Sequence, residues 1–115
     1  MDTKLTCSAS ALLNTWSAHD WVEGVQLEAM RDMDRLIVHT QNSTYEITVI
    51  SASSGEILIR GGRFFPEFTS ARLAGSSLGG SFLKLRGIYL GFSLEVHCEH
   101  RFIVTSRVLK ISVAA

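Results

Sequence analysis

Hydrophobic and polar residues alternate along most of the chain after residue 35, and a period of two is typical of β-strands with one buried face. The alternation predicts three successive strands over about residues 35–40, 45–50 and 56–60. Residues 41–44 and 51–55, which lie between them, are rich in the Asn, Ser and Gly that tight turns favour. The first part of the chain is therefore predicted to be an antiparallel meander.

The longest alternation runs from Ile88 to Cys98. One face of this segment would be apolar, whereas Glu95 and His97 would share the opposite face. Because strands usually contain five or six residues, we expect this one to bend at Gly87 or Gly91.

The chain then turns at residues 99–100 and returns as a last strand. Ser106 or Arg107 interrupts the alternation between residues 101–105 and residues 108–113. A break of this kind inside the last strand is how small barrels close, so we expect the strands to curve around one core.

Two segments leave alternatives open. Apolar residues at helical spacing, with Asp20 as an N-cap, predict a helix over about residues 20–32, whereas Gly24 favours an extended segment there. Residues 63–73 suit either a short strand or one helical turn, and Pro66 places them at a sheet edge or in a loop.

Together these elements predict a mainly β fold, either a small antiparallel β-barrel or a strongly bent sheet of six to seven strands, with one N-terminal helix. A chain of 115 residues suits a single domain. We expect residues 16–115 to form that domain and residues 1–15 to be a flexible tail. The N-terminus does not resemble a signal peptide and no apolar run is long enough to cross a membrane, so we expect a cytoplasmic protein without membrane contact.

Glycines are concentrated in residues 75–80, where we expect a bend that lets the strand from Ile88 to Cys98 cross the sheet. Residues 75–79 also have the Gly-x-Ser-x-Gly spacing of a nucleophile elbow. That motif functions only between a parallel strand and a helix, and the chain has no such pattern, so we expect no enzymatic activity.

Hydrophobic residues make up 46% of the chain and charged residues 19%, and the formal net charge is zero. The zero conceals an asymmetry, because residues 1–59 carry three basic and eight acidic residues whereas residues 60–115 carry eight basic and three acidic ones. We expect the two halves to pack against each other, within one chain or between subunits, or to leave a basic face for an anion.

The basic residues of the second half flank the glycine-rich segment on both sides. Guanidinium groups and exposed backbone N–H groups are the usual ligands of phosphate. The predicted anion site contains Arg60, Arg63, Arg72, Ser76, Ser77, Lys84 and Arg86.

This arrangement loosely resembles the PilZ barrels, in which an arginine-rich segment precedes an acidic or amide residue, then a serine and a glycine. Arg60 and Arg63 are three residues apart where that family has four, and Ala74 or Gly75 stands where it has Asp or Asn. The resemblance implies binding of a cyclic dinucleotide.

Other ligand classes have less support in the sequence. The cluster from His97 to His100 would place its members on opposite faces of a strand, so we expect no metal site and no cofactor. Zero net charge makes nucleic-acid binding an unfavourable interpretation. Cys7 and Cys98 are expected to be free thiols.

The sequence thus predicts a non-enzymatic binding module that acts through protein–protein contacts, with self-association into a homo-oligomer as the first expectation. The predicted interface residues are Trp16, Trp21, Val25 and Met30. The alternative is a site for an anionic small molecule, such as a nucleotide or cyclic dinucleotide, or for single-stranded nucleic acid, at the arginines around residues 75–80.

Overall fold

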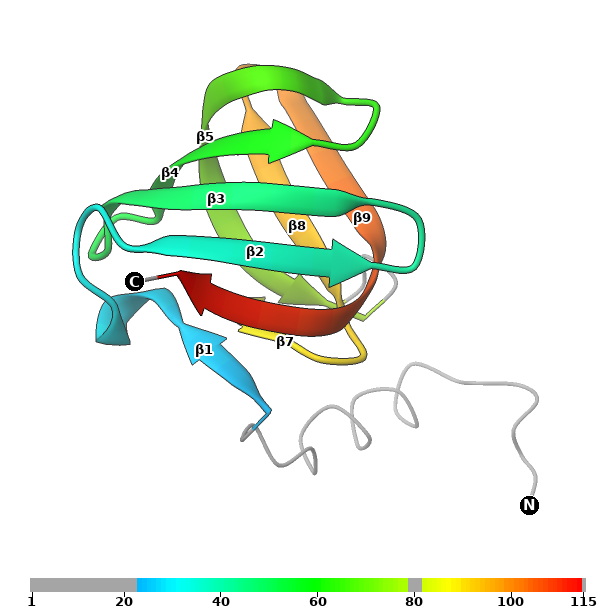
Figure 1. Ribbon diagram of the computed structural model, residues 1–115, viewed down its shortest axis with the longest axis horizontal. Helices are drawn as coiled ribbons and strands as arrows, with labels where there is room; N and C mark the ends of the chain where they lie inside the picture. The colour runs from blue at the N-terminus through cyan, green and yellow to red at the C-terminus, as the bar shows by residue number, and fades with distance from the viewer. Residues whose placement is uncertain (1–22, 79–81, 115) are drawn as a thin grey trace.

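The computed structural model describes residues 23–78 and 82–114, and strands dominate them (Figure 1). A single turn of 3-10 helix, Leu27–Ala29, follows the first strand. The strands are β1 (Gly24–Gln26), β2 (Arg35–Thr40), β3 (Thr44–Ser51), β4 (Glu56–Gly61), β5 (Phe65–Ser77), β6 (Leu83–Leu85), β7 (Gly87–Tyr89), β8 (Ser93–Cys98) and β9 (Arg101–Ala114).

Six of these strands close into a ring. The larger antiparallel sheet has the order β4-β3-β2-β9-β8-β5-β6, and β4 also pairs with β5, so β2, β3, β4, β5, β8 and β9 form a continuous circuit (Figure 1). The two longest strands make this possible because each pairs with two other strands of the ring in turn. Strand β5 pairs first with β4 and then with β8, and β9 pairs first with β8 and then with β2.

The inside of the ring is the hydrophobic core predicted from the alternation. Strands β2, β3 and β4 bury every second side chain, and the positions between them are exposed or half-buried. The core contributions of these three strands are Leu36, Val38, Tyr45, Ile47, Val49, Ile57 and Ile59. The meander over residues 35–60 is confirmed.

Strand β9 contains the predicted break. Its register against β8 shifts between Val104 and Arg107, and the strand continues against β2 from Val108 onward. A β-bulge increases the local twist of a strand, which lets β9 leave one neighbour and join the other.

The helix predicted over about residues 20–32 is absent from the described part of that segment, which begins at residue 23. Residues 24–26 form β1, which pairs with β7 in a separate two-stranded sheet. A Cβ atom at Gly24 would lie 2.3 Å from the carbonyl oxygen of Ile88, so only glycine permits this close approach. The extended alternative therefore holds for residues 24–26.

The glycine-rich segment differs from its prediction in part. Gly75, Ser76 and Ser77 do not form a turn but end the long strand β5, where all three are buried. Residues 63–73 are accordingly mostly strand. The segment from Ile88 to Cys98 bends as predicted at Gly91, whose φ is +87°, and this bend divides it into β7 and β8.

Several predictions concern residues 1–22, which lie outside the described part of the chain. These are the flexible tail over residues 1–15 and the interface role of Trp16 and Trp21. Val25 and Met30, the other two predicted interface residues, are partly buried against the protein's own core. Within the described residues, none of the helical segments has the length and apolar character that crossing a bilayer requires.

Candidate functional site

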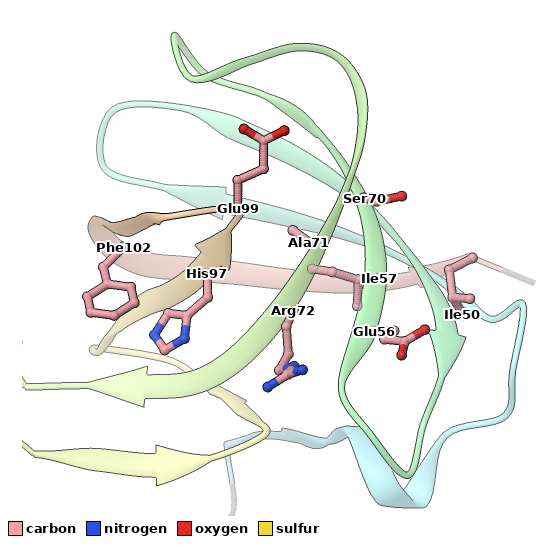
Figure 2. A pocket seen from close by; sticks show the side chains of 9 residues that line it. All are labelled: Ile50, Glu56, Ile57, Ser70, Ala71, Arg72, His97, Glu99 and Phe102. Carbon is pink, nitrogen blue, oxygen red and sulfur yellow. The ribbon is translucent and has the colours of Figure 1, made fainter.

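A hollow of about 450 Å³ opens on the surface where β5 changes partners (Figure 2). Arg72 marks the place, because it is the register partner of Glu56 on β4 and of His97 on β8. Beyond Arg72 towards the start of β5, that strand no longer pairs with β8, which ends at Cys98. The hollow is lined by Ile50, Glu56, Ile57, Ser70, Ala71, Arg72, His97, Glu99 and Phe102.

Four of the lining residues form one row across four strands. Glu56 of β4 stands opposite Arg72 of β5, Arg72 opposite His97 of β8, and His97 opposite Phe102 of β9. Register partners in an antiparallel sheet project from the same face, so their side chains are neighbours. Figure 2 shows Arg72 between His97 and Glu56, with Phe102 beyond His97.

The imidazole ring of His97 is held on two sides. Its Nε2 is 2.8 Å from the Oε2 of Glu95, the next outward residue on β8, and its ring centroid is 4.3 Å from that of Phe102. The side chains of Glu95 and His97 are 19% and 33% exposed. The carboxylate engages Nε2, and within the described part of the chain no hydrogen bond to the other ring nitrogen, Nδ1, is present.

Two other arginines of the predicted anion site, Arg60 and Arg86, form ion pairs with glutamates, whereas among the described residues Arg72 forms none. Arg60 forms an ion pair with Glu46 and lies over the ring of Phe68, with its Cζ 4.3 Å from the centroid. The Nε of Arg86 donates to Glu28 at 2.7 Å. Arg72 and its neighbour Glu56 form no ion pair within the part of the chain that the structure describes.

These two ion pairs connect the halves of the chain. Glu46 and Glu28 belong to the acidic half, and Arg60 and Arg86 belong to the basic half. The expectation that the two halves pack against each other within one chain therefore holds at both contacts.

The predicted anion site does not form one cluster. Arg72 and Arg86 approach each other beside Gly55, where a Cβ atom would lie 3.5 Å from a side-chain carbon of each. Arg60 lies on β4 and pairs with Glu46 of β3, and Arg63 is exposed in the turn that follows β4. Lys84 lies on β6, opposite Ser76 in the register.

The two serines predicted to bind an anion, Ser76 and Ser77, are both buried inside the protein. Ser76 is 0% exposed, and its Oγ donates to the carbonyl oxygen of Gly87 at 2.9 Å and accepts from the backbone N–H of Tyr89 at 3.0 Å. Ser77 is 1% exposed. A ligand on the surface does not reach either hydroxyl.

His97, Phe102 and Glu95 were not among the predicted site residues. The alternation in the sequence already placed Glu95 and His97 on one outward face, so their proximity to each other could have been predicted. Their meeting with Arg72 was not predictable, because it depends on the register between β8 and β5, two strands that are not consecutive in the chain.

The predicted absence of a metal site stays a prediction. Cys98 is a buried free thiol whose Sγ donates to the carbonyl oxygen of Ser70 at 3.7 Å, on the other side of the strand from His97. Among residues 23–78 and 82–114, no three His, Cys, Asp or Glu side chains gather closely enough to hold a metal ion.

A second surface begins at the rim of the hollow. Phe102 is 74% exposed, and Val104, the next outward residue of β9, is 44% exposed. Large apolar side chains with this exposure are often found where proteins bind one another.

Comparison with family models, curated proteins and solved structures finds no match.

Proposed function

We propose that this protein is a non-enzymatic binding domain that associates with a second copy of itself through the outer face and free edge of β9. The observation that carries the proposal is the exposure of Phe102 and Val104 side by side on that strand. The buried position of Ser77 in the middle of a sheet supports a non-enzymatic role, because a nucleophile at this place in a Gly-x-Ser-x-Gly segment must be exposed.

The backbone of β9 supports the same surface. Among the residues that the structure describes, residues 101–104 have ladder partners on the β8 side alone, whereas β2 pairs with β9 from Val108 onward. The turn between β2 and β3 covers the edge just before that point, where the N–H of Gln41 donates to the carbonyl of Arg107 at 3.0 Å. Residues 101–104 of β9 therefore present an unpaired strand edge, which is a template for another strand.

Two copies can use this edge symmetrically. Antiparallel pairing centred on Ile103 places Phe102 opposite the second copy's Val104, and the reverse pair follows from two-fold symmetry. Arg101 then lies opposite the second copy's Thr105, so no like charges face each other. Aromatic and β-branched residues in cross-strand pairs stabilise a sheet, and each pair contributes about 0.2–1 kcal/mol.

This proposal changes the interface that the sequence suggested. Val25 and Met30 contact the protein's own core, so they offer less surface than β9 does. Homo-oligomerisation remains the proposed function, and its site moves from the N-terminal segment to the last strand.

The test is light scattering over a dilution series of the full chain and two variants. Val104→Lys places a charge at the proposed contact, and lysine on an edge strand opposes pairing. We expect the unmodified protein to form dimers that dissociate on dilution, and Val104→Lys to be monomeric. Leu85→Lys is the matched control, because Leu85 is 57% exposed on a different strand, β6.

A monomer at every concentration would refute self-association. Dimers that survive Val104→Lys but dissociate in Leu85→Lys would instead locate the interface at β6. Circular dichroism of each variant verifies that the fold is unchanged.

A further inference from the structure

We infer that the hollow beside Arg72 binds a small zwitterion, namely an α-amino acid with an apolar side chain. This goes beyond the proposed self-association and does not depend on it. The inference combines a pair of opposite charges, a positioned histidine and an apolar wall, all within one hollow.

The charged pair consists of one acidic and one basic side chain on neighbouring strands. Glu56 and Arg72 are opposite each other in the register of β4 and β5, yet within the described residues neither forms an ion pair. Two opposite charges on neighbouring strands match a ligand whose ammonium and carboxylate are attached to one carbon. The guanidinium of Arg72 would hold the carboxylate in a two-point contact, and the carboxylate of Glu56 would accept from the ammonium.

The ring of His97 lies beside this charged pair (Figure 2). Glu95 and Phe102 fix the ring of His97 next to Arg72, so its placement requires no reorganisation when a ligand arrives. Groups that are ordered before binding lower the entropic cost of association. Nδ1 of His97 is therefore a ready second contact for the polar end of the ligand.

Apolar side chains also border the hollow. Ile50 and Phe102, which are 36% and 74% exposed, border the same hollow. Ile57 and Ala71 also line it, but Ile57 is only 1% exposed and both pack against the core. A volume of about 450 Å³ falls within the usual range of small-molecule pockets, roughly 300–1,000 Å³. An amino acid with an aromatic or branched side chain would place that side chain here.

The acidic lining distinguishes this ligand from a phosphate compound. Glu56 and Glu99 both border the hollow, and their negative charges would repel a dianion. A zwitterion avoids this repulsion, because its ammonium faces a carboxylate while its carboxylate faces Arg72.

The experiment is a nuclear magnetic resonance titration of the full chain that follows the ring signals of His97, with His39 on β2 as an internal reference outside the hollow. The probes are L-phenylalanine, 3-phenylpropanoate, which lacks the ammonium, phenethylamine, which lacks the carboxylate, and phenyl phosphate. We expect L-phenylalanine to shift the His97 signals and to bind at least about tenfold more tightly than each of the other three.

Two charge-neutralising variants examine the assignment of each group. Arg72→Gln should remove the advantage of L-phenylalanine over phenethylamine, and Glu56→Gln should remove its advantage over 3-phenylpropanoate. If Arg72 and Glu56 only stabilised the fold, the two variants would not each lose a different one of these two advantages. Arg63→Gln, an exposed arginine outside the hollow, should leave all four affinities unchanged.

The inference is overturned if saturating L-phenylalanine leaves His97 unshifted, or if phenyl phosphate binds more tightly than L-phenylalanine. Val104→Lys separates this result from the proposed function. The variant should bind L-phenylalanine as the unmodified chain does, although we expect it to be monomeric.

Discussion

The hydroxyl of Ser76 accepts a hydrogen bond from the backbone N–H of Tyr89 at 3.0 Å. The same hydroxyl donates to the carbonyl oxygen of Gly87 at 2.9 Å. Because Ser76 lies in β5 and Tyr89 ends β7, one buried side chain connects the ring of six strands to the small sheet of β1 and β7. A residue that the sequence suggested for anion binding is thus a structural connection.

Ser76→Ala should lower the free energy of unfolding by about 1–3 kcal/mol. The substitution leaves a buried N–H and a buried carbonyl without their partner, and an unsatisfied buried group has a cost of this order. Urea unfolding followed by circular dichroism measures the change. Ser70→Ala is the control, because Ser70 is exposed and its loss should change stability by less than about 0.5 kcal/mol. Equal effects of the two substitutions would contradict the structural role of Ser76.

Gly75 and Gly91 should respond differently to alanine. Both have positive φ, +149° and +87°, and a left-handed backbone costs a residue with a Cβ about 1–2 kcal/mol. A Cβ at Gly75 would also lie 2.0 Å from the carbonyl oxygen of Lys84, whereas a Cβ at Gly91 would meet nothing within 4 Å. Gly91→Ala should therefore fold with a modest loss of stability, and Gly75→Ala should lose clearly more. Thermal unfolding compares them, and a smaller loss at Gly75 would show that β6 can move away without cost.

The contact between Glu28 and Arg86 predicts a pH dependence of stability. The pKa of Glu28 lies below its ordinary value of 4.5, chiefly because its own backbone N–H donates to the carboxylate, and also because Arg86 and Gln26 donate to it. A lowered carboxyl pKa gives stability that is present above pH 4.5 and is lost as the pH falls through the pKa of the folded state. The side chain of Glu28 is 42% exposed and that of Arg86 is 34% exposed, so the effect should be less than about 1 kcal/mol.

Chemical unfolding between pH 3 and pH 7 tests this expectation. Glu28→Gln should weaken the protein at pH 7 and reduce the loss on acidification. Arg86→Gln should produce part of the same effect, and the double variant should lose less than the sum of the two. A fully additive double variant would mean that the two side chains do not interact in solution.

The sequence by itself determined the elements whose pattern is local. A strand with one buried face must alternate, so residues 35–60 revealed β2, β3 and β4. The break in β9 was visible as an interruption of the alternation at Ser106 or Arg107, and the bend at Gly91 was expected at Gly87 or Gly91 because the alternation was too long for one straight strand. The physical reason is that burial of one face imposes its period on the residues of the strand itself.

Only the tertiary structure decided features that depend on a distant partner. Phe64 and Phe65 are identical neighbours in the sequence, yet Phe64 is 44% exposed and Phe65 is 0% exposed. The pairing of β1 with β7 made residues 24–26 extended where helical spacing predicted a helix. The hollow likewise exists because β4, β5, β8 and β9 align Glu56, Arg72, His97 and Phe102 in one row. Registers between remote strands are fixed by the packing of the whole ring, and no local pattern contains them.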